Sequence, residues 1–281
     1  MTSKEFIDEI CEHGDTKLIV KYQEFMAFQK VAWDTLLEFD RVCRKNRINY
    51  QLSFGSLIGA IRDGGQIPWD YDIDVLVPYE ERTNLVNALS RDLDQGYYFV
   101  CSENRDDCRN NILRVTPNKY DSDHMHVDVF FLIGLPDDEH ERRLFQRKIK
   151  DLSDVKYIKR ISLKAAWKKS KRYVLEVLRK KMKLALADLK QNEVEYQELC
   201  QMYNIANSQY CTTADTFAAD YQIPTEYIRT TCDYNILGKS ILIPEMYDEF
   251  LKLIYNNYMS IPSYVNRRDE FIKFYTLIKS D

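Results

Sequence analysis

The chain has 281 residues, 45% of them hydrophobic and 30% charged, and its 8 Gly and 7 Pro are too few for a long disordered tail. The seven cysteines include no C-x-x-C pair, which argues against a disulfide framework or a zinc site of standard spacing and fits a reducing compartment. No apolar run approaches the roughly 20 residues that span a bilayer, and residues 1–5 lack a secretory signal, so we expect a cytoplasmic protein.

The first half of the chain alternates between helical and strand patterns. Apolar side chains spaced by three or four, among them Phe25, Phe28 and Phe39, predict a leading helix over residues 15–48. A second helix is predicted at about 79–93. Strands are predicted around it, near residues 50–54, 72–77, 97–101, 112–116 and 127–132. This order indicates an α+β fold, with a mixed β-sheet core and flanking helices.

The second half is predicted to contain more helix. Residues 141–208 read as mainly helical, and from 209 on short segments end at prolines and include one helix at 245–258. No internal repeat and no linker rich in Gly, Pro or Ser divides the chain. We therefore predict a catalytic core over 1–140, a basic helical insertion over 141–208, and a C-terminal segment over 209–281 that packs back on the core.

Three carboxylates, Asp70, Asp72 and Asp74, are spaced two apart. If residues 72–75 are extended, Asp72 and Asp74 point to one face while Ile73 and Val75 point to the core. Such a pair on a rigid strand suits Mg²⁺, which takes a few carboxylate oxygens and leaves other positions to water and phosphates. An isolated Asp-x-Asp is equally compatible with a solvated strand edge or turn.

A small-residue turn, Gly55-Ser56, precedes these acids. Its backbone N–H groups can cradle a phosphate, because Gly allows close approach and Ser adds a hydroxyl donor at the start of a helix. A Gly-Ser pair alone more often marks a plain turn. Here it is followed by Arg62, a Gly-Gly turn and Pro68-Trp69, which together with the acids make a far more specific combination.

A third carboxylate is expected at Asp128, in the last predicted strand of the core. A charge flanked by apolar residues is costly to bury without a partner or a metal. His124 and His126 share its face at period two, so one of them can contact a phosphate, or both can be hydrogen-bonded surface groups. Arg114 suits an oxyanion and is equally compatible with a surface charge on a strand.

Positive charge is concentrated between Glu141 and Lys190, which contain 18 Lys or Arg and 5 Asp or Glu. This excess indicates an anionic partner. Within 167–189 apolar residues recur at helical spacing among the cations, a pattern typical of a helix lying on an anionic membrane surface and also of an ordinary helix packed on the core. No nucleic-acid-binding module accompanies the basic segment, so we predict no nucleic-acid partner.

Residues 55–74 resemble the motif of the LicD family, which has a Gly-Ser or Gly-Thr turn, a Leu-Leu-Gly-Ala-x-Arg run and then Ile-Pro-Trp-Asp-Asp-Asp-Ile-Asp. Residues 126–136 are similar to the second acidic strand of the family and the Gly-Leu-Pro that follows it. Residues 243–262 are similar to its closing segment. The resemblance therefore covers about residues 35–265.

The chain departs from the family pattern at three places. Tyr71 stands where the family usually has a middle Asp, Asp63-Gly64 replaces a typically basic pair, and Asn256-Asn257 replaces a common Gly-Asp. The first change leaves the three carboxylates intact. The change at 63–64 bears on substrate selectivity and not on metal binding.

The resemblance implies a nucleotidyltransferase-like fold, related to the fukutin-type transferases, whose Gly-Ser turn and Asp-x-Asp strand define the site. It implies Mg²⁺, with Mn²⁺ as the alternative, held by Asp72, Asp74 and Asp128, which are also the expected catalytic residues. Asp128 is expected to accept the proton of the attacking hydroxyl. The expected substrate-binding residues are Gly55, Ser56, Arg62, Trp69, Asp70, Tyr71, Arg114 and His126.

The implied activity is transfer of a phospho-alcohol, foremost phosphocholine, from a CDP-alcohol to a hydroxyl of a cell-surface glycan or its lipid-linked precursor, with release of CMP. Lipopolysaccharide, teichoic acid and capsule are the glycans expected, and the enzyme is expected in the cytoplasm or at the inner face of the membrane. Trp69 and Tyr71 are near enough to contribute to a choline site. CDP-glycerol or CDP-ribitol, a nucleotidyltransferase that releases pyrophosphate, and a catalytically silent binding protein are the alternatives.

Overall fold

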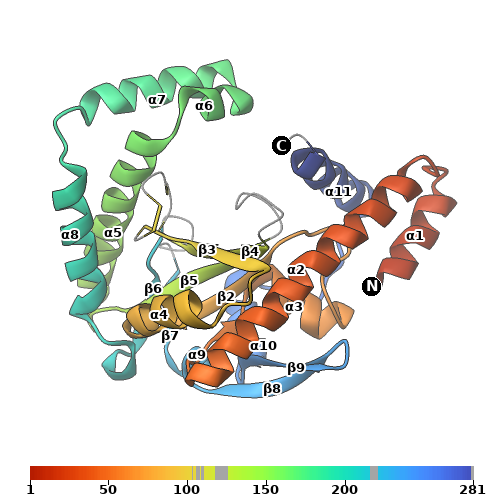
Figure 1. The fold of residues 1–281 in the computed structure, drawn as a ribbon, viewed down its shortest axis with the longest axis horizontal. Coiled ribbons are helices and arrows are strands. Elements are labelled where there is room, and N and C mark those ends of the chain that lie inside the picture. Colours follow the sequence, from red (N-terminus) through yellow and green to blue (C-terminus); the bar gives the residue numbers. More distant parts are fainter. Residues whose placement is uncertain (103, 106–107, 109–110, 118–125, 216–220, 280–281) are drawn as a thin grey trace.

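The computed structural model describes residues 1–279 apart from 103, 106–107, 109–110, 118–125 and 216–220. Its centre is a seven-stranded mixed sheet with helices around it, and a two-stranded ribbon lies beside the sheet (Figure 1). The α+β architecture predicted from the order of the elements is confirmed. His124 belongs to the segment outside the described residues.

The sheet is built around β2 (Ile73–Pro78) and β5 (Val127–Gly134), which run parallel. On one side of β2 lies the short β1 (Gln51–Leu52). On the far side of β5 follow β4 (Leu113–Pro117) and then β3 (Tyr97–Val100). All pairs other than β2–β5 are antiparallel, so the two strands that carry the predicted acids are the parallel pair.

The sheet continues into the C-terminal third of the chain. The second half of β5 pairs with β6 (Tyr210–Thr213), and β6 pairs with β7 (Ile223–Pro224). The separate ribbon consists of β8 (Thr231–Ile236) and β9 (Lys239–Pro244). Residues far apart in sequence thus share one sheet, although the division at 140 and 208 stays a prediction.

The two faces of β2 and β5 differ because side chains alternate along each strand. Ile73, Val75 and Val77 are buried in the core, and so are Val127 and Val129. The residues between them, which include both acids of these strands, point to the other face. Helix α2 (Leu18–Asn46) packs against β2, β4 and β5.

The first helix of the chain packs against α2, which in turn lies on the sheet. Helix α1 (Ser3–Glu12) begins with a capping box between Thr2 and Glu5, in which each side chain accepts from the backbone N–H of the other. The turn into the sheet contains α3 (Phe54–Ile58) and the π-helical turn η1 (Gly59–Asp63). After β2 come the 3₁₀ turn η2 (Tyr79–Glu81) and α4 (Arg82–Asp92).

The basic segment forms an arm of four helices. Helix α5 (Glu139–Arg160) packs against α8 (Leu189–Met202), and between them the chain forms α6 (Leu163–Lys169) and α7 (Lys171–Lys183) (Figure 1). Side chains of Asp138, Ser170 and Asp188 cap α5, α7 and α8. A 3₁₀ turn η3 (Ile205–Asn207) leads back to the sheet. No helix among the described residues combines the length and the apolarity that crossing a membrane requires.

The chain ends with three helices, α9 (Glu226–Arg229), α10 (Tyr247–Tyr255) and α11 (Tyr264–Lys279). Helix α11 packs against α2, so that N-terminal and C-terminal helices lie side by side (Figure 1). The predicted leading helix, five strands and helix near 245–258 are all present. Helices α1 and α11 and strands β6 to β9 were not predicted.

Candidate active site

The candidate site is a row of charged residues across three neighbouring strands. Asp74 in β2 lies opposite Asp128 in β5, and Asp128 lies opposite Arg114 in β4. Paired positions in a sheet point their side chains to the same face, so the three groups converge. Asp72 lies just before β2, and His126 lies just before β5, so both continue the row by one alternation.

Asp128 is held on both sides by cationic or proton-donating groups. Its Oδ1 accepts a hydrogen bond from Arg114 Nε at 2.7 Å, and its Oδ2 lies 3.2 Å from His126 Nε2. Burial acts to raise the pKa of Asp128, but His126 and Arg114 favour the charged form more strongly, so the pKa lies below its ordinary value. Asp128 is therefore a firmly ionised carboxylate, although it is 6% exposed.

Asp72, His126 and Asp128 form the one group of metal-ligating side chains found among the described residues. One ligand atom from each residue lies within 4.8 Å of the other two. The second ring nitrogen of His126, Nδ1, is buried and has no hydrogen-bond partner in the described part of the chain. This group shares Asp72 and Asp128 with the predicted metal set and contains His126 in place of Asp74.

The remaining acids carry unbalanced negative charge. Burial, followed by the charge of Asp70, raises the pKa of Asp72 well above its usual range. Burial and the charges of Asp72 and Asp128 do the same to the pKa of Asp74. Burial also raises the pKa of Asp70, to about 6, although a hydrogen bond with Asp72 acts to lower it. Such a cluster of half-buried acids is typical of a cation site.

Gly55 and Ser56 of the Gly-Ser turn contact two of these acids. A Cβ atom on Gly55 would lie 2.9 Å from Asp70 Oδ2, so a larger residue would displace that carboxylate. Ser56 Oγ accepts a hydrogen bond of 2.9 Å from the backbone N–H of Asp74. Phe54 adopts a φ of 48°, a conformation that side chains rarely take and that marks the sharp turn from β1 into α3.

Helices from both ends of the chain hold the acidic loop in place. Gln29 of α2 is buried, and its Nε2 donates hydrogen bonds to the carbonyl oxygens of Ile67 (2.9 Å) and Asp70 (2.6 Å). Tyr71 lies between His126, at 6.3 Å between ring centroids, and Phe274 of α11, at 4.8 Å. Tyr71 is thus at the site, as its place in the motif predicts.

Arg62 and Trp69 lie in a different cluster. The guanidinium of Arg62 pairs with Asp63 at 2.8 Å, donates to two carbonyl oxygens of the 258–260 turn and lies over the Trp69 ring. Trp69 is 4% exposed and contacts Phe6 of α1. These contacts are all with groups of the protein, and substrate binding by Arg62 and Trp69 stays a prediction.

Two residues beside the acids were not predicted as site residues. Asp215, at the end of β6, is 4% exposed, and its charge raises the pKa of Asp74. Tyr255, at the end of α10, is 41% exposed, and burial of its hydroxyl together with the charges of Asp74 and Asp70 raises its pKa. No motif surrounds either residue, and only the path of β6 and α10 brings them to the site.

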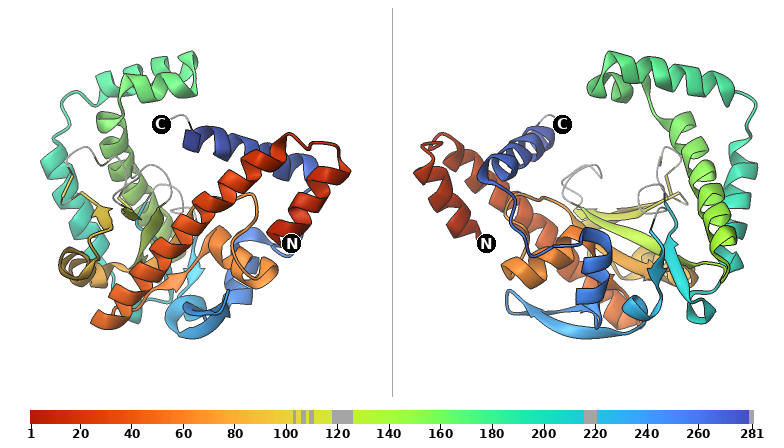
Figure 2. Two further views of the ribbon diagram at one scale, coloured as in Figure 1. Left: turned by 45° about the vertical axis from the view of Figure 1, so that its right-hand side comes forward. Right: turned by 180° about the vertical axis from the view of Figure 1, so that it is seen from behind.

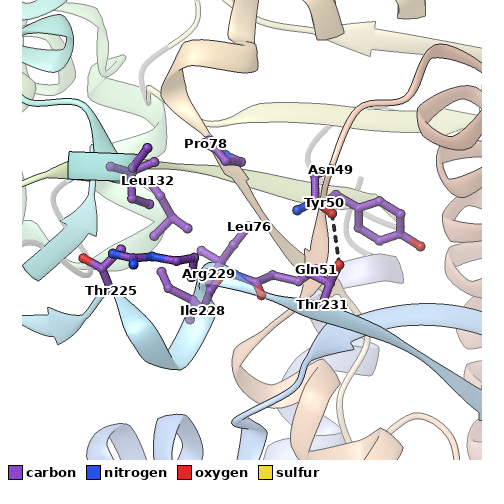
Figure 3. Close-up of a pocket in the computed structure, with 12 residues that line it drawn as sticks. Asn49, Tyr50, Gln51, Leu76, Pro78, Leu132, Thr225, Ile228, Arg229 and Thr231 are labelled. Atoms are coloured by element: carbon purple, nitrogen blue, oxygen red, sulfur yellow. Dashed lines mark hydrogen bonds between the residues drawn. The ribbon is translucent and has the colours of Figure 1, made fainter. Parts of the chain in front are cut away.

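A cavity of about 150 Å³ lies further along the acid-bearing face (Figure 3). Leu76, Pro78 and Leu132 line it, at even steps beyond Asp74 and Asp128, opposite residues of α9. Gln51 closes one side, where its Nε2 donates to the carbonyl oxygen of Ile228 at 3.3 Å. None of the predicted site residues lines this cavity, so it is separate from the acids.

Residues 47–150 match the protein family described as LicD/FKTN/FKRP, nucleotidyltransferase domain. The matched segment contains the Gly-Ser turn, β2, β4 and β5, and hence all the charged residues of the row. The chain carries a LicD-family nucleotidyltransferase domain. The resemblance inferred from the motif is confirmed.

Whole-chain similarity extends beyond the LicD-family domain. The chain is 25% identical over 263 residues to the lipopolysaccharide cholinephosphotransferase LicD of Haemophilus influenzae, covering 87% of this chain and 95% of that protein. It is 33% identical over 66 residues to an uncharacterised protein of Rickettsia typhi, 21% of each chain. A protein of Rickettsia prowazekii, also uncharacterised, is 38% identical over 53 residues, 19% of this chain and 20% of that protein.

Proposed function

We propose that this protein is a LicD-type phosphotransferase that moves phosphocholine from CDP-choline to a hydroxyl of a cell-surface glycan or its lipid-linked precursor, releasing CMP. The observation that carries the proposal is the convergence of Asp72, Asp74 and Asp128 on one face of two parallel strands. Similarity to a lipopolysaccharide cholinephosphotransferase along most of the chain supports the choice of phosphocholine and of a lipopolysaccharide-like acceptor.

The donor set fits a divalent cation. Carboxylate oxygens suit Mg²⁺ and Mn²⁺. Burial and neighbouring acids raise the pKa of Asp72 and Asp74, and a bound cation would offset this repulsion between carboxylates. We assign Asp72 and Asp128 as its ligands, with His126 as the third group of the cluster. When bound, such a cation would offset the charge of the diphosphate of the donor and of the leaving CMP.

Asp128 and Asp74 differ in whether their carboxylates are hydrogen-bonded, and we propose different roles for them. Both oxygens of Asp128 face Arg114 or His126, which leaves this carboxylate poorly placed to accept a proton. The carboxylate of Asp74 makes no hydrogen bond with the described residues. We therefore revise our prediction and propose Asp74 as the group that takes the proton of the acceptor hydroxyl. Arg114 is placed to stabilise a phosphate oxygen next to Asp128.

The quaternary ammonium of choline has no N–H group and binds to aromatic faces. Trp69 is 4% exposed, whereas the charges of the acids act on the pKa of both Tyr71 and Tyr255. We propose that these two tyrosines contact the choline group. CDP-glycerol and CDP-ribitol would instead require hydrogen bonds to their hydroxyls.

The proposal is tested by incubating the protein with Mg²⁺ or Mn²⁺ and CDP-choline, CDP-glycerol or CDP-ribitol, and measuring CMP release by chromatography. We expect CMP from CDP-choline and a metal-dependent rise in Tm with the same donor. Release of pyrophosphate from a nucleoside triphosphate, with no CMP from any CDP-alcohol, would instead establish a nucleotidyltransferase.

Three variants separate the proposed roles. Asp72→Asn should abolish both CMP release and the metal-dependent rise in Tm, since it removes a ligand. Asp74→Asn should lower CMP release by about 100-fold or more while keeping the metal-dependent rise. Asp34→Asn removes an exposed carboxylate of α2 that pairs with Lys30 and should change neither. Full activity of Asp72→Asn would refute the enzyme proposal.

A further inference from the structure

The α6–α7 hairpin stands apart from the core of the protein. Ile161, Ala166 and Val177 form a small hydrophobic cluster of their own, with Tyr157, Tyr173 and Val174 packed against it. Val177 is the one buried residue of α7. In Figures 1 and 2 the hairpin (green) lies at the outer end of α5, away from the sheet. Its second face is therefore available for a partner.

That second face carries a stripe of large apolar side chains. Leu175, Leu178 and Met182 are spaced by three and four, so they lie along one side of α7, and they are 68%, 37% and 71% exposed. Leu186 follows the helix and is fully exposed. Val177 points away from this side, into the small cluster. Exposed apolar side chains in a continuous row mark an interaction surface.

An exposed tryptophan extends the stripe at its N-terminal end. Trp167 of α6 is 59% exposed, and the Nζ of Lys171 lies 5.6 Å from its ring centroid. Lys171 lies one helical turn before Leu175 and two turns before Leu178, on the side of α7 that carries the stripe. We call Trp167, Leu175, Leu178, Met182 and Leu186 the apolar stripe.

Cations surround the apolar stripe. Residues 163–187 contain nine Lys or Arg and a single acid, Glu176, which pairs with Lys180 at 2.9 Å. Arg172, Arg179 and Lys183, spaced by seven and four, lie along one border of the stripe. The surface thus combines apolar side chains at its centre with positive charge at its edge.

We infer that the apolar stripe lies on the surface of an anionic phospholipid bilayer. An amphipathic helix buries its apolar side at the boundary of headgroups and acyl chains, and its Lys and Arg contact the lipid phosphates. A nucleic acid would leave the leucines and Met182 in water. A second copy of the chain would bring two strongly positive surfaces together. The inference uses none of the residues in the proposed active site.

The test is co-sedimentation of the full chain with vesicles in about 0.1 M salt, where the Debye length is about 10 Å. We expect binding to vesicles of phosphatidylglycerol and phosphatidylethanolamine, and little binding to vesicles of phosphatidylcholine alone. Leu175→Ser/Met182→Ser should weaken binding by about tenfold or more, and Arg179→Gln/Lys183→Gln by a similar factor. The matched control is Val194→Ser/Met202→Ser on α8, which changes residues 54% and 58% exposed and should bind as the parent does.

Fluorescence gives an independent readout. Trp167 is exposed, whereas Trp69 is buried and Trp33 is half-buried against the core, so insertion should shift the emission of Trp167 to shorter wavelength on anionic vesicles. Trp167→Phe should remove this shift. An unchanged emission spectrum of the bound protein would show that the stripe stays in water and would overturn the inference.

Other outcomes would overturn it as well. Loss of binding in the charge variant alone, together with competition by a DNA duplex, would identify a polyanion-binding surface. A dimer in solution that Leu175→Ser/Met182→Ser dissociates would identify a second copy as the partner. CMP release from CDP-choline without vesicles should be the same in all these variants, so failure of the proposed function and failure of membrane binding are measured separately.

Discussion

At the scale of single residues, the site depends on how closely the Gly-Ser turn approaches the acids. Gly55 leaves room for the carboxylate of Asp70, and Ser56 fixes the backbone of Asp74. Asp70 in turn accepts a hydrogen bond of 3.0 Å from the N–H of Tyr71. A methyl group at position 55 would therefore displace Asp70 and, through it, the backbone of the acidic loop.

We predict that Gly55→Ala shifts Asp70 and lowers CMP release from CDP-choline by about tenfold or more, because misplaced groups at a reacting centre lose rate steeply. The folded structure should persist, since the added Cβ meets the end of a side chain and not the backbone. Gly96→Ala is the matched control, because a Cβ there meets nothing within 4 Å. Equal activity of both variants would show that the position of Asp70 is unimportant.

At the scale of elements, a buried lysine joins the helical arm to the loop after β3. Lys156 of α5 is 2% exposed. Its Nζ donates to Ser102 Oγ and Asn111 Oδ1, both at 2.6 Å, and lies 3.1 Å from a carboxylate oxygen of Glu193 in α8. Burial lowers the pKa of Lys156, but its Nζ has these three partners. The network therefore positions three elements together.

We predict that Lys156→Met destabilises the protein by about 3 kcal/mol, since it leaves Asn111 and Glu193 without their partner. Urea unfolding followed by circular dichroism measures the change. Lys148→Met offers a matched control on the same two helices, because Lys148 pairs with Glu195 at 2.8 Å in a solvent-exposed position. That pair should be worth less than about 1 kcal/mol. Similar losses in both variants would contradict the assigned role of burial.

At the scale of the whole molecule, the acid cluster lowers the stability of the metal-free fold. Asp70, Asp72 and Asp74 are half-buried, and burial raises the pKa of all three, while the charges of neighbouring acids raise the pKa of Asp72 and Asp74 further. A site that destabilises its own fold is typical of function, where charge is arranged for a ligand.

We predict that Asp70→Asn raises the free energy of unfolding of the metal-free protein at pH 7 by about 2 kcal/mol. Asp70 has a pKa of about 6 in the folded protein, above its ordinary value, so the folded state takes up a proton first as the pH falls. Stability of the parent should therefore rise between pH 7 and pH 4 through this group. In Asp70→Asn the free energy of unfolding should rise less over this pH range. An equal dependence on pH in both proteins would contradict the prediction.

The chain ends show what sequence patterns missed. Helix α1 reaches the core through Phe6 and Ile10, and α11 through Phe271, which contacts both Tyr22 and Phe25 of α2. Apolar residues are spread around α11 and do not form a single stripe, so its periodicity is weak. Strand β8 has one buried residue, Ile236, so it lacks the buried apolar run that marks β2 and β5.

The amino-acid sequence determined the local parts of the site. Alternation in β2 and β5 and the Gly-Ser motif were enough to predict which acids share a face, because these signals lie within a few neighbouring residues. Only the tertiary structure decided which groups surround them. Pairing of β2 with β5 brought His126 beside Asp72, and the return of the chain through β6 and α10 added Asp215 and Tyr255. These contacts join residues distant in sequence, and they depend on how whole elements bury their apolar faces against one another.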